Sequence, residues 1–260
     1  MGTAREQGEI WGARATDWAE ASEPAWEPVF AAALDAAGVA AGTRLLDIGC
    51  GAGGALVLAR LRGAEVAGLD AAAATVAIAR QRLPGAEIAV GEMEELPFAA
   101  GRFDTAIGIN SFQFAGNPGN ALAEARRVVR PGGAVAMLVW GRREDCDLLT
   151  KVMPAVFALL PPPAAPPPPS VPYAEPGVIE SLMRGAGLSP RKAEEFPAAL
   201  EFASLDLALR AILSASARAI RHAGEVHVRA TVSDALQASR RDDGSIRLDN
   251  RFRIVVAGRR

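Results

Sequence analysis

Leu45-Leu46-Asp47-Ile48-Gly49-Cys50-Gly51-Ala52-Gly53-Gly54 is the stretch that decides the fold. Its apolar start predicts a buried strand over residues 44–48, and its alternating glycines predict a tight turn after that strand. Glycine tolerates positive φ and lets a ligand approach the backbone without a Cβ in the way. Dinucleotide-binding enzymes carry a similar loop, and ordinary glycine-rich turns look the same, so this stretch alone does not identify a ligand.

The residues after this turn alternate between short apolar runs and longer helical patterns. This rhythm predicts parallel strands joined by right-handed helical crossovers, which is a doubly wound α/β sheet of the Rossmann type. The strands are expected over residues 44–48, 65–69, 88–90, 105–109 and 134–139, and the helices over 55–62, 72–83 and 119–129.

The flanking regions predict further elements. An apolar stripe predicts a helix over residues 24–37, with Ser22 as its N-cap and Gly38 as its stop. Residues 160–172 are rich in proline and are expected to form an extended connector, since proline disrupts helices and central strands. The rest is expected as helices over 177–186, 205–222 and 226–239, strands over 191–196 and 252–256, and a turn at Asp243-Gly244.

Polar residues follow three of the predicted strands, at the sheet edge where open α/β folds bind ligands. Asp70 ends the second strand, 21 positions after Gly49, where a carboxylate accepts hydrogen bonds from ribose hydroxyls. After the third strand, Glu92 is suited to accept from an exocyclic amine while Met93 covers an adenine face. Asn110-Ser111 follows the fourth strand. The alternative for Asp70 is an ordinary surface aspartate, and the alternative for Glu92 and Met93 is a solvated acidic loop.

Together these residues resemble the class I S-adenosylmethionine-dependent methyltransferases, in particular the small-molecule branch that includes ubiquinone- and menaquinone-biosynthesis enzymes. The resemblance extends from about Trp11 to Arg259. It implies a seven-stranded, mostly parallel Rossmann-like sheet with a terminal antiparallel strand and a helical lid or cap. The turn Arg130-Pro131-Gly132-Gly133 and the closing segment Val255-Val256-Ala257 match structural elements of that family.

The resemblance also implies roles for individual residues. The loop would cradle the methionine portion of the cofactor, Asp70 would bind the ribose, and Glu92 with Met93 would hold the adenine. The implied cofactor-binding set is Trp11, Trp18, Asp47, Gly49, Cys50, Gly51, Gly53, Asp70, Ala71, Glu92, Met93, Asn110 and Ser111, with the two tryptophans as an aromatic lid. Two positions depart from the family pattern, because Glu92 replaces the usual aspartate and Ala71 replaces a helix-capping residue.

Composition limits the other classes of function. A net charge of -2 disfavours a nucleic-acid partner, and two cysteines are too few for a disulfide framework or a thiolate zinc site. We expect no metal, no membrane span and a reduced, cytoplasmic setting. One domain is predicted over 1–260, made of a lid and first helix (1–37), a cofactor-binding core (38–140), a substrate-side insertion and cap (141–240) and a closing strand (241–260). Composition does not indicate an oligomeric state.

The expected reaction is methyl transfer from S-adenosylmethionine to an oxygen or carbon, less readily a nitrogen, of a small apolar or aromatic metabolite, leaving S-adenosylhomocysteine. No catalytic residue is assigned: His222 and His227 are interpreted as surface residues, and Tyr173 as a candidate for the acceptor pocket. A hydrophobic wall for that pocket, or else a helix packed wholly in the core, is expected from Leu148, Leu149, Val152, Met153, Val156, Phe157 and Leu159. The alternatives are a nicotinamide-dependent oxidoreductase and a non-catalytic protein that binds S-adenosylmethionine.

Overall fold

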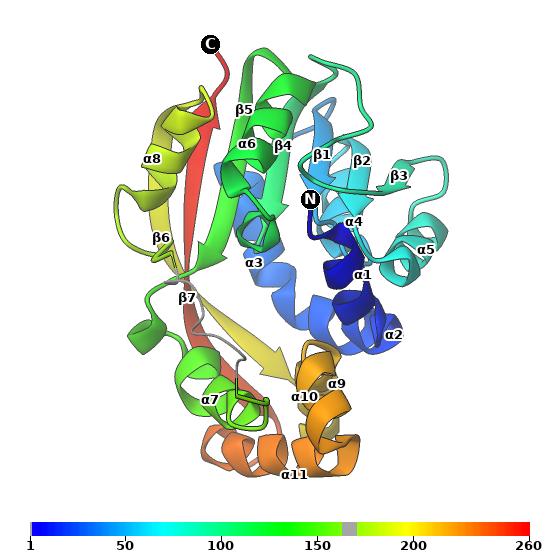
Figure 1. Cartoon of the computed structure of the whole chain (residues 1–260), viewed down its shortest axis with the longest axis vertical. Helices are drawn as coiled ribbons and strands as arrows, with labels where there is room; N and C mark the ends of the chain where they lie inside the picture. The colour runs from blue at the N-terminus through cyan, green and yellow to red at the C-terminus, as the bar shows by residue number, and fades with distance from the viewer. Residues whose placement is uncertain (1, 163–170) are drawn as a thin grey trace.

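The computed structural model describes residues 2–162 and 171–260, and its centre is one seven-stranded sheet (Figure 1). The strand order is β3-β2-β1-β4-β5-β7-β6, with β7 antiparallel to both of its neighbours and β1 to β5 parallel. The strands are β1 (Arg44–Ile48), β2 (Glu65–Asp70), β3 (Glu87–Val90), β4 (Phe103–Ile109), β5 (Val129–Trp140), β6 (Ser189–Phe202) and β7 (Ile246–Gly258). The predicted mostly parallel sheet with an antiparallel strand near its end is confirmed.

Helices cover both faces of this sheet, because the strands are apolar on both sides. In β5, Ala136 and Leu138 point into one core, and Val135 and Met137 point into the other. The first core includes α3, α4 and α5, and the second includes α6 and α8. The α-helices are α1 (Ala4–Gly12), α2 (Ala15–Asp17), α3 (Glu23–Ala36), α4 (Gly54–Leu61), α5 (Ala73–Arg82), α6 (Pro118–Val128), α7 (Met153–Phe157), α8 (Val178–Gly185), α9 (Leu205–Ser214), α10 (Ala217–Ala223) and α11 (Glu225–Leu236).

Shorter helical turns join these elements. Two of them are π-helical, η1 (Trp18–Ser22) and η4 (Leu148–Val152), and each leads directly into an α-helix. The others are 3₁₀ turns, η2 (Phe112–Phe114), η3 (Arg143–Asp145) and η5 (Gln237–Ser239).

The predicted cap of one helix, the continuity of another and the lengths of three strands need correction. Ser22 is not a capping residue, because η1 continues into α3 and the Ser22 hydroxyl donates instead to the carbonyl of Ala211. The helix expected over 205–222 is interrupted between α9 and α10, where the Ser216 hydroxyl bonds the Ile212 carbonyl. The strands expected over 134–139, 191–196 and 252–256 are longer than predicted and span residues 129–140, 189–202 and 246–258. Most of the proline-rich connector expected over 160–172 lies outside the described residues.

The segment predicted as a substrate-side cap, 141–240, divides between the two ends of the molecule. Its α8 packs against the second core through Ile179 and Met183, and β6 is an edge strand of the sheet. In contrast, η4, α7, α9, α10 and α11 gather at the other end, where β7 extends beyond β5 (Figure 1). The pairing of β5 with β7 stops at Trp140↔Phe252, whereas β6 follows β7 to Ile246. This projecting ribbon therefore supports a separate helical layer beside the carboxyl ends of the parallel strands.

Candidate functional site

Two adjoining chambers open at the carboxyl ends of β1, β2, β3 and β4. The inner chamber, with about 960 Å³ of space when its open mouth is included, is bounded by the glycine loop, the ends of these strands and the N-terminal helix. The outer chamber, of about 1430 Å³ measured the same way, lies against the projecting β6–β7 ribbon and its helices. Residues that line both chambers form their junction: Gln7, Trp11, Trp18, Trp26, Asn110 and Phe114.

The glycine loop after β1 forms one wall of the inner chamber. Gly49, Gly51 and Gly53 have φ values of +85°, +55° and +87°, as the alternating pattern predicts. A Cβ on Gly51 would lie 2.9 Å from the indole nitrogen of Trp18, so this glycine is needed for the close approach of the lid. Gly53 differs, because it faces Ala79 of α5 and Leu83, the residue after that helix, and is not a lining residue.

Asp70 fastens this loop to the end of β2. Its carboxylate accepts from the backbone amides of Gly51, at 2.9 Å, and Ala72, at 2.8 Å. The carboxylate also lines the inner chamber, where Ala71 is its neighbour, and burial raises the pKa of Asp70. Asp70 thus holds the loop in shape in addition to facing the space where a ligand would lie.

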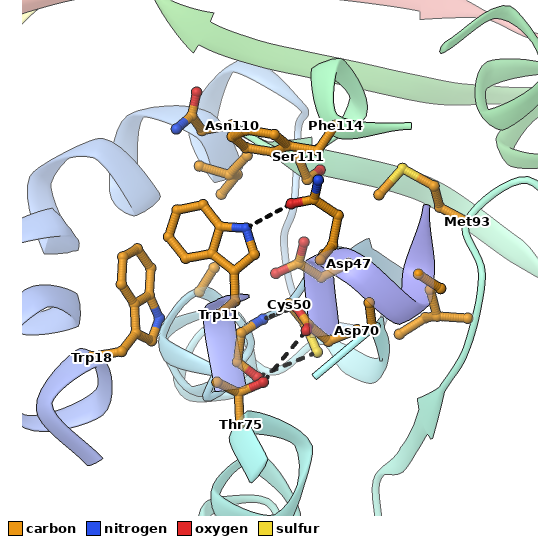
Figure 2. Close-up of a pocket in the computed structure, with 18 of the residues that line it drawn as sticks. Trp11, Trp18, Asp47, Cys50, Asp70, Thr75, Met93, Asn110, Ser111 and Phe114 are labelled. Carbon is orange, nitrogen blue, oxygen red and sulfur yellow. Dashed lines mark hydrogen bonds between the residues drawn. The ribbon is translucent and has the colours of Figure 1, made fainter. Parts of the chain in front are cut away.

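Asp47 lines the inner chamber, as do Cys50 and Asp70 (Figure 2). The side chain is buried, and its Oδ1 has no hydrogen-bond partner among the described residues. Burial, with further contributions from the charges of Asp70 and Glu23, raises the pKa of Asp47 to about 8. A buried carboxylate oxygen without a partner costs free energy, so this atom is suited to a cationic or hydrogen-donating ligand group.

Sequence reasoning missed Glu23, which begins α3 and is 5% exposed. Its Oε1 accepts from the Ala52 amide of the loop and from the indole nitrogen of Trp18. Its Oε2 pairs with Arg82 at 2.5 Å, and Arg82 also donates to the carbonyl of Ala52. A charged residue inside an apolar helical stripe is the one sequence signal that could have indicated this role.

The helix α1 covers the mouth of the inner chamber. The Ala4 amide donates to Oε2 of Glu92 at 2.9 Å, and the Thr3 hydroxyl donates to the carbonyl of Phe114 at 2.6 Å. A Cβ on Gly8 would lie 2.5 Å from the Ala71 carbonyl, so α1 is packed closely on the loop after β2. Glu92, predicted from the sequence as an adenine contact, therefore also anchors the first turn of this lid.

Met93, Asn110 and Ser111 lie where the sequence predicts, around the same chamber (Figure 2). The Ser111 hydroxyl donates to the carbonyl of Ile48 at 2.5 Å, which ties the end of β4 to the end of β1. Asn110 has a φ of +52°, and asparagine is among the few non-glycine residues that adopt this left-handed conformation readily.

Trp11 and Trp18 lie between the chambers, and Figure 2 shows the Trp11 ring pointing into the space between Asp47 and Phe114. The ring centroids of Trp11 and Trp18 are 5.5 Å apart, and Trp11 lies 5.6 Å from Phe114, both in edge-to-face contacts. The structure therefore brings the predicted aromatic lid to the junction. Gln7 of α1, which sequence reasoning missed, accepts the Trp11 indole N–H at 3.1 Å.

The outer chamber has an apolar lining. Five of the residues predicted for its wall contribute: Leu148, Leu149, Met153, Val156 and Phe157. Val152 is instead fully buried in the first core, and Leu159 packs against that core. Tyr173 packs against the second core and is not a lining residue, so its assignment to the acceptor pocket was wrong.

The remaining titratable candidates lie elsewhere or have structural roles. His222 and His227 are exposed, as predicted. Cys50 and Cys146 are buried free thiols, and burial raises the pKa of both. Within residues 2–162 and 171–260 no three His, Cys, Asp or Glu side chains gather as a metal site requires. The same residues contain no helix long and apolar enough to cross a membrane.

Comparisons with known proteins agree with this geometry. Residues 46–137 match the family model described as a methyltransferase domain. Over 92 residues, the chain is 39% identical to the malonyl-acyl-carrier-protein O-methyltransferase of Pseudescherichia vulneris, covering 35% of this chain and 37% of that protein. It is 40% identical over 99 residues to the phthiotriol/phenolphthiotriol dimycocerosates methyltransferase of Mycobacterium leprae, covering 36% of this chain and 37% of the relative. The chain thus spans little more than a third of the length of these curated relatives.

Among solved structures, the (4+2)-cyclase SpnF superposes with a TM-score of 0.58 at 20% identity, covering 90% of this chain and 81% of the other. This similarity concerns the fold. Because one fold supports different reactions, the function has to be argued from the residues of the site.

Proposed function

We propose that this chain, which belongs to the class I S-adenosylmethionine-dependent methyltransferases, transfers a methyl group to a small, largely apolar molecule. The observation that carries the proposal is the pair of joined chambers. The inner one is walled by the glycine loop and four acidic residues, and the outer one is apolar. A methyl donor and its acceptor need two such compartments that meet at one point.

The residues of the inner chamber fit S-adenosylmethionine. The unpartnered Oδ1 of Asp47 is suited to the cationic methionine portion, and the positive-φ glycines leave backbone exposed beside it. Asp70 is suited to the ribose and Met93 to the adenine face. When bound, the cofactor supplies a methyl group activated by a sulfonium.

The chain itself would orient the reactants and exclude water. Helix α1, held by Glu92 and by the Phe114 carbonyl, covers the inner chamber, and Trp11 and Trp18 narrow the passage to the outer one. Holding a nucleophile in line with the methyl group at van der Waals distance contributes several kcal/mol to lowering the barrier. Closing the site also keeps solvent from competing with the acceptor.

The proposal is tested by incubating the protein with methyl-labelled S-adenosylmethionine and a panel of apolar acids, phenols, alcohols and amines. Label should enter the organic phase with the unmodified protein. Leu149→Glu, which places a charge on the wall of the outer chamber, should abolish transfer but leave cofactor affinity unchanged.

Val226→Glu is the matched control, because Val226 is 85% exposed and lies outside both linings. It should transfer label like the unmodified protein. Tight cofactor binding without transfer to any acceptor would instead favour a non-catalytic protein that binds S-adenosylmethionine.

A further inference from the structure

The junction between the chambers presents hydrogen-bond donors. The side-chain oxygen of Gln7 accepts the Trp11 indole N–H, and the side-chain oxygen of Asn110 accepts from the side-chain amide of Gln113. Both carbonyl groups are therefore engaged, and the amide nitrogen of each side chain is left for a ligand. The indole N–H of Trp18 is engaged by Glu23. Each amide nitrogen could donate to an acceptor atom on its side of the junction, which suits an oxygen with lone pairs and does not suit an N–H nucleophile.

The outer chamber offers no side chain to take a proton. Among its described lining residues, Arg218 is the single ionisable one, and it lies at the surface paired with Glu6. The Ser22 and Ser216 hydroxyls both donate to backbone carbonyls. Residues 163–170, which are Pro, Ala and Ser, have no ionisable side chain to add. A nucleophile that must lose a proton during the reaction would lack a general base on this side.

The carboxylates of the inner chamber are committed to other contacts. Glu23 binds Ala52 and Arg82, Asp70 binds Gly51 and Ala72, and Glu92 binds Ala4. Asp47 has an unpartnered oxygen, but it lines the inner chamber and not the outer one. We assign that oxygen to the cationic cofactor.

We propose that the acceptor is an apolar acid whose nucleophile is an oxygen already ionised in solution, either a carboxylate or an acidic enol. This inference rests on the proposed function and names the substrate class of the same site. An anion is also favoured by charge, since a sulfonium and an oxyanion attract strongly where apolar walls exclude water. The apolar part of the acid would fill the outer chamber between Met153, Phe157 and the β6–β7 ribbon.

The reaction balances without a base. A lone pair of the oxyanion forms the new O–CH₃ bond as the C–S bond breaks, and the electrons of that bond remain on sulfur. The negative and positive charges cancel, so an ester or enol ether and a neutral thioether are formed, and no proton moves. Apolar walls favour this step because charge disappears along it.

The test compares how four probes bind beside two unreactive cofactor analogues. S-adenosylhomocysteine is neutral at sulfur, whereas sinefungin carries a protonated amine in place of the methylsulfonium. The probes are dodecanoate, 3-dodecyl-4-hydroxycoumarin as the acidic enol, 1-dodecanol and dodecylamine, titrated while the tryptophan fluorescence is recorded. Four tryptophans line the outer chamber, so its occupancy should be visible.

At least one of the two acids should bind about tenfold more tightly with sinefungin than with S-adenosylhomocysteine, while dodecanol binds equally with both. Dodecylamine should show the opposite preference. The acid with the larger preference identifies the carboxylate or the enol as the nucleophile. Acids that bind equally with both analogues, or that do not bind, would overturn the inference. If neither analogue binds, the proposed function itself fails.

Two variants test the donors at the junction. Asn110→Asp keeps a residue that tolerates the positive φ but replaces the amide nitrogen with a charged oxygen, and Gln7→Glu does the same on α1. Each folded variant should bind the acids about tenfold or more weakly beside either analogue, because a donor is replaced by a charge that repels the anion. Asn117→Asp, at an exposed helix cap outside both linings, is the matched control and should bind the acids like the unmodified protein. Unchanged affinity for the acids in both junction variants would contradict the proposal.

Discussion

The indole nitrogen of Trp18 lies 3.2 Å from Oε1 of Glu23, and the same oxygen accepts the backbone amide of Ala52 in the glycine loop at 2.9 Å. One carboxylate thus holds both the glycine loop, which is a wall of the inner chamber, and the Trp18 side chain at the junction with the outer chamber. The Arg82 guanidinium pairs with this carboxylate from α5. The cofactor wall and the passage to the acceptor are therefore mechanically connected through α3.

Glu23→Ala should weaken S-adenosylmethionine binding and lower stability, because it leaves the Ala52 amide and the Arg82 charge without their partner. We expect a loss of about 1–3 kcal/mol in the free energy of unfolding and about tenfold or more in the dissociation constant. Glu23→Gln keeps an oxygen for Ala52 and Trp18, so it should retain most of the affinity. Calorimetric titration and thermal unfolding measure the two effects.

Asp35→Ala is the control for Glu23. Asp35 also lies on α3, and it forms an exposed ion pair with Arg62, which follows α4. Exposed pairs contribute little, so both quantities should stay close to those of the unmodified protein. Equal effects of Glu23→Ala and Glu23→Gln would show that Glu23 acts through its charge alone and not by positioning the loop.

Gly51→Ala should abolish tight cofactor binding. Its Cβ would meet the Trp18 indole and Glu23 at 2.9 and 3.2 Å, and the residue would have to keep a φ of +55°. The conformational strain alone costs about 1–2 kcal/mol. Gly38→Ala imposes similar strain at a φ of +70° with open space around the Cβ. Gly51→Ala should lose at least as much stability as Gly38→Ala, and cofactor affinity should fall in Gly51→Ala alone.

The raised pKa of Asp47 predicts that S-adenosylmethionine binding depends on pH. Because that pKa is about 8, the carboxyl is mostly protonated at neutral pH, and a cationic ligand would have to displace the proton. Affinity should rise by up to about tenfold per pH unit toward pH 8 and then level off. In Asp47→Asn the affinity should no longer depend on pH through this carboxyl, and any pH dependence that remains should come from the ligand. Titration calorimetry from pH 6 to 9, in buffers of different ionisation enthalpy, measures the proton released.

The raised pKa of Asp47 also makes the stability of the unliganded protein depend on pH. A carboxyl whose folded-state pKa is raised stabilises the fold below its unfolded-state pKa, and that contribution is lost as pH rises through the folded value. Between about pH 4 and 8, Asp47 should therefore lower stability by about 1.4 kcal/mol per pH unit. Asp47→Asn should be less sensitive to pH over this range in urea unfolding. Parallel profiles for the two proteins would show that Asp47 is not buried as the structure has it.

Much of the core could be predicted from the sequence, because apolar periodicity and glycine both act locally. The strands β1 to β4 and the positive φ at Gly49, Gly51 and Gly53 follow from neighbouring residues alone. Strand β6 was underestimated because Pro190 and Pro197 interrupt its pattern. Both are tolerated since β6 is an edge strand, with one side free of pairing.

The parts of the site that sequence reasoning missed depend on contacts between distant residues. Glu23 and Arg82 are 59 positions apart, and their pairing follows from the packing of α3 and α5 around the loop. Glu92 and Ala4 meet only because α1 folds back across the sheet edge. The dual role of Asp70, as a loop clamp and a ligand contact, could not be seen in its spacing from Gly49 either.

The most direct measurement of the central claim is a pair of calorimetric titrations of the unmodified protein, one with S-adenosylmethionine and one with NAD⁺. We predict one-to-one binding of S-adenosylmethionine, weakened in Asp70→Asn because that carboxylate both shapes the loop and faces the ligand. NAD⁺ should give no binding heat. Tight binding of NAD⁺ with no response to S-adenosylmethionine would contradict the account and favour a nicotinamide-dependent oxidoreductase.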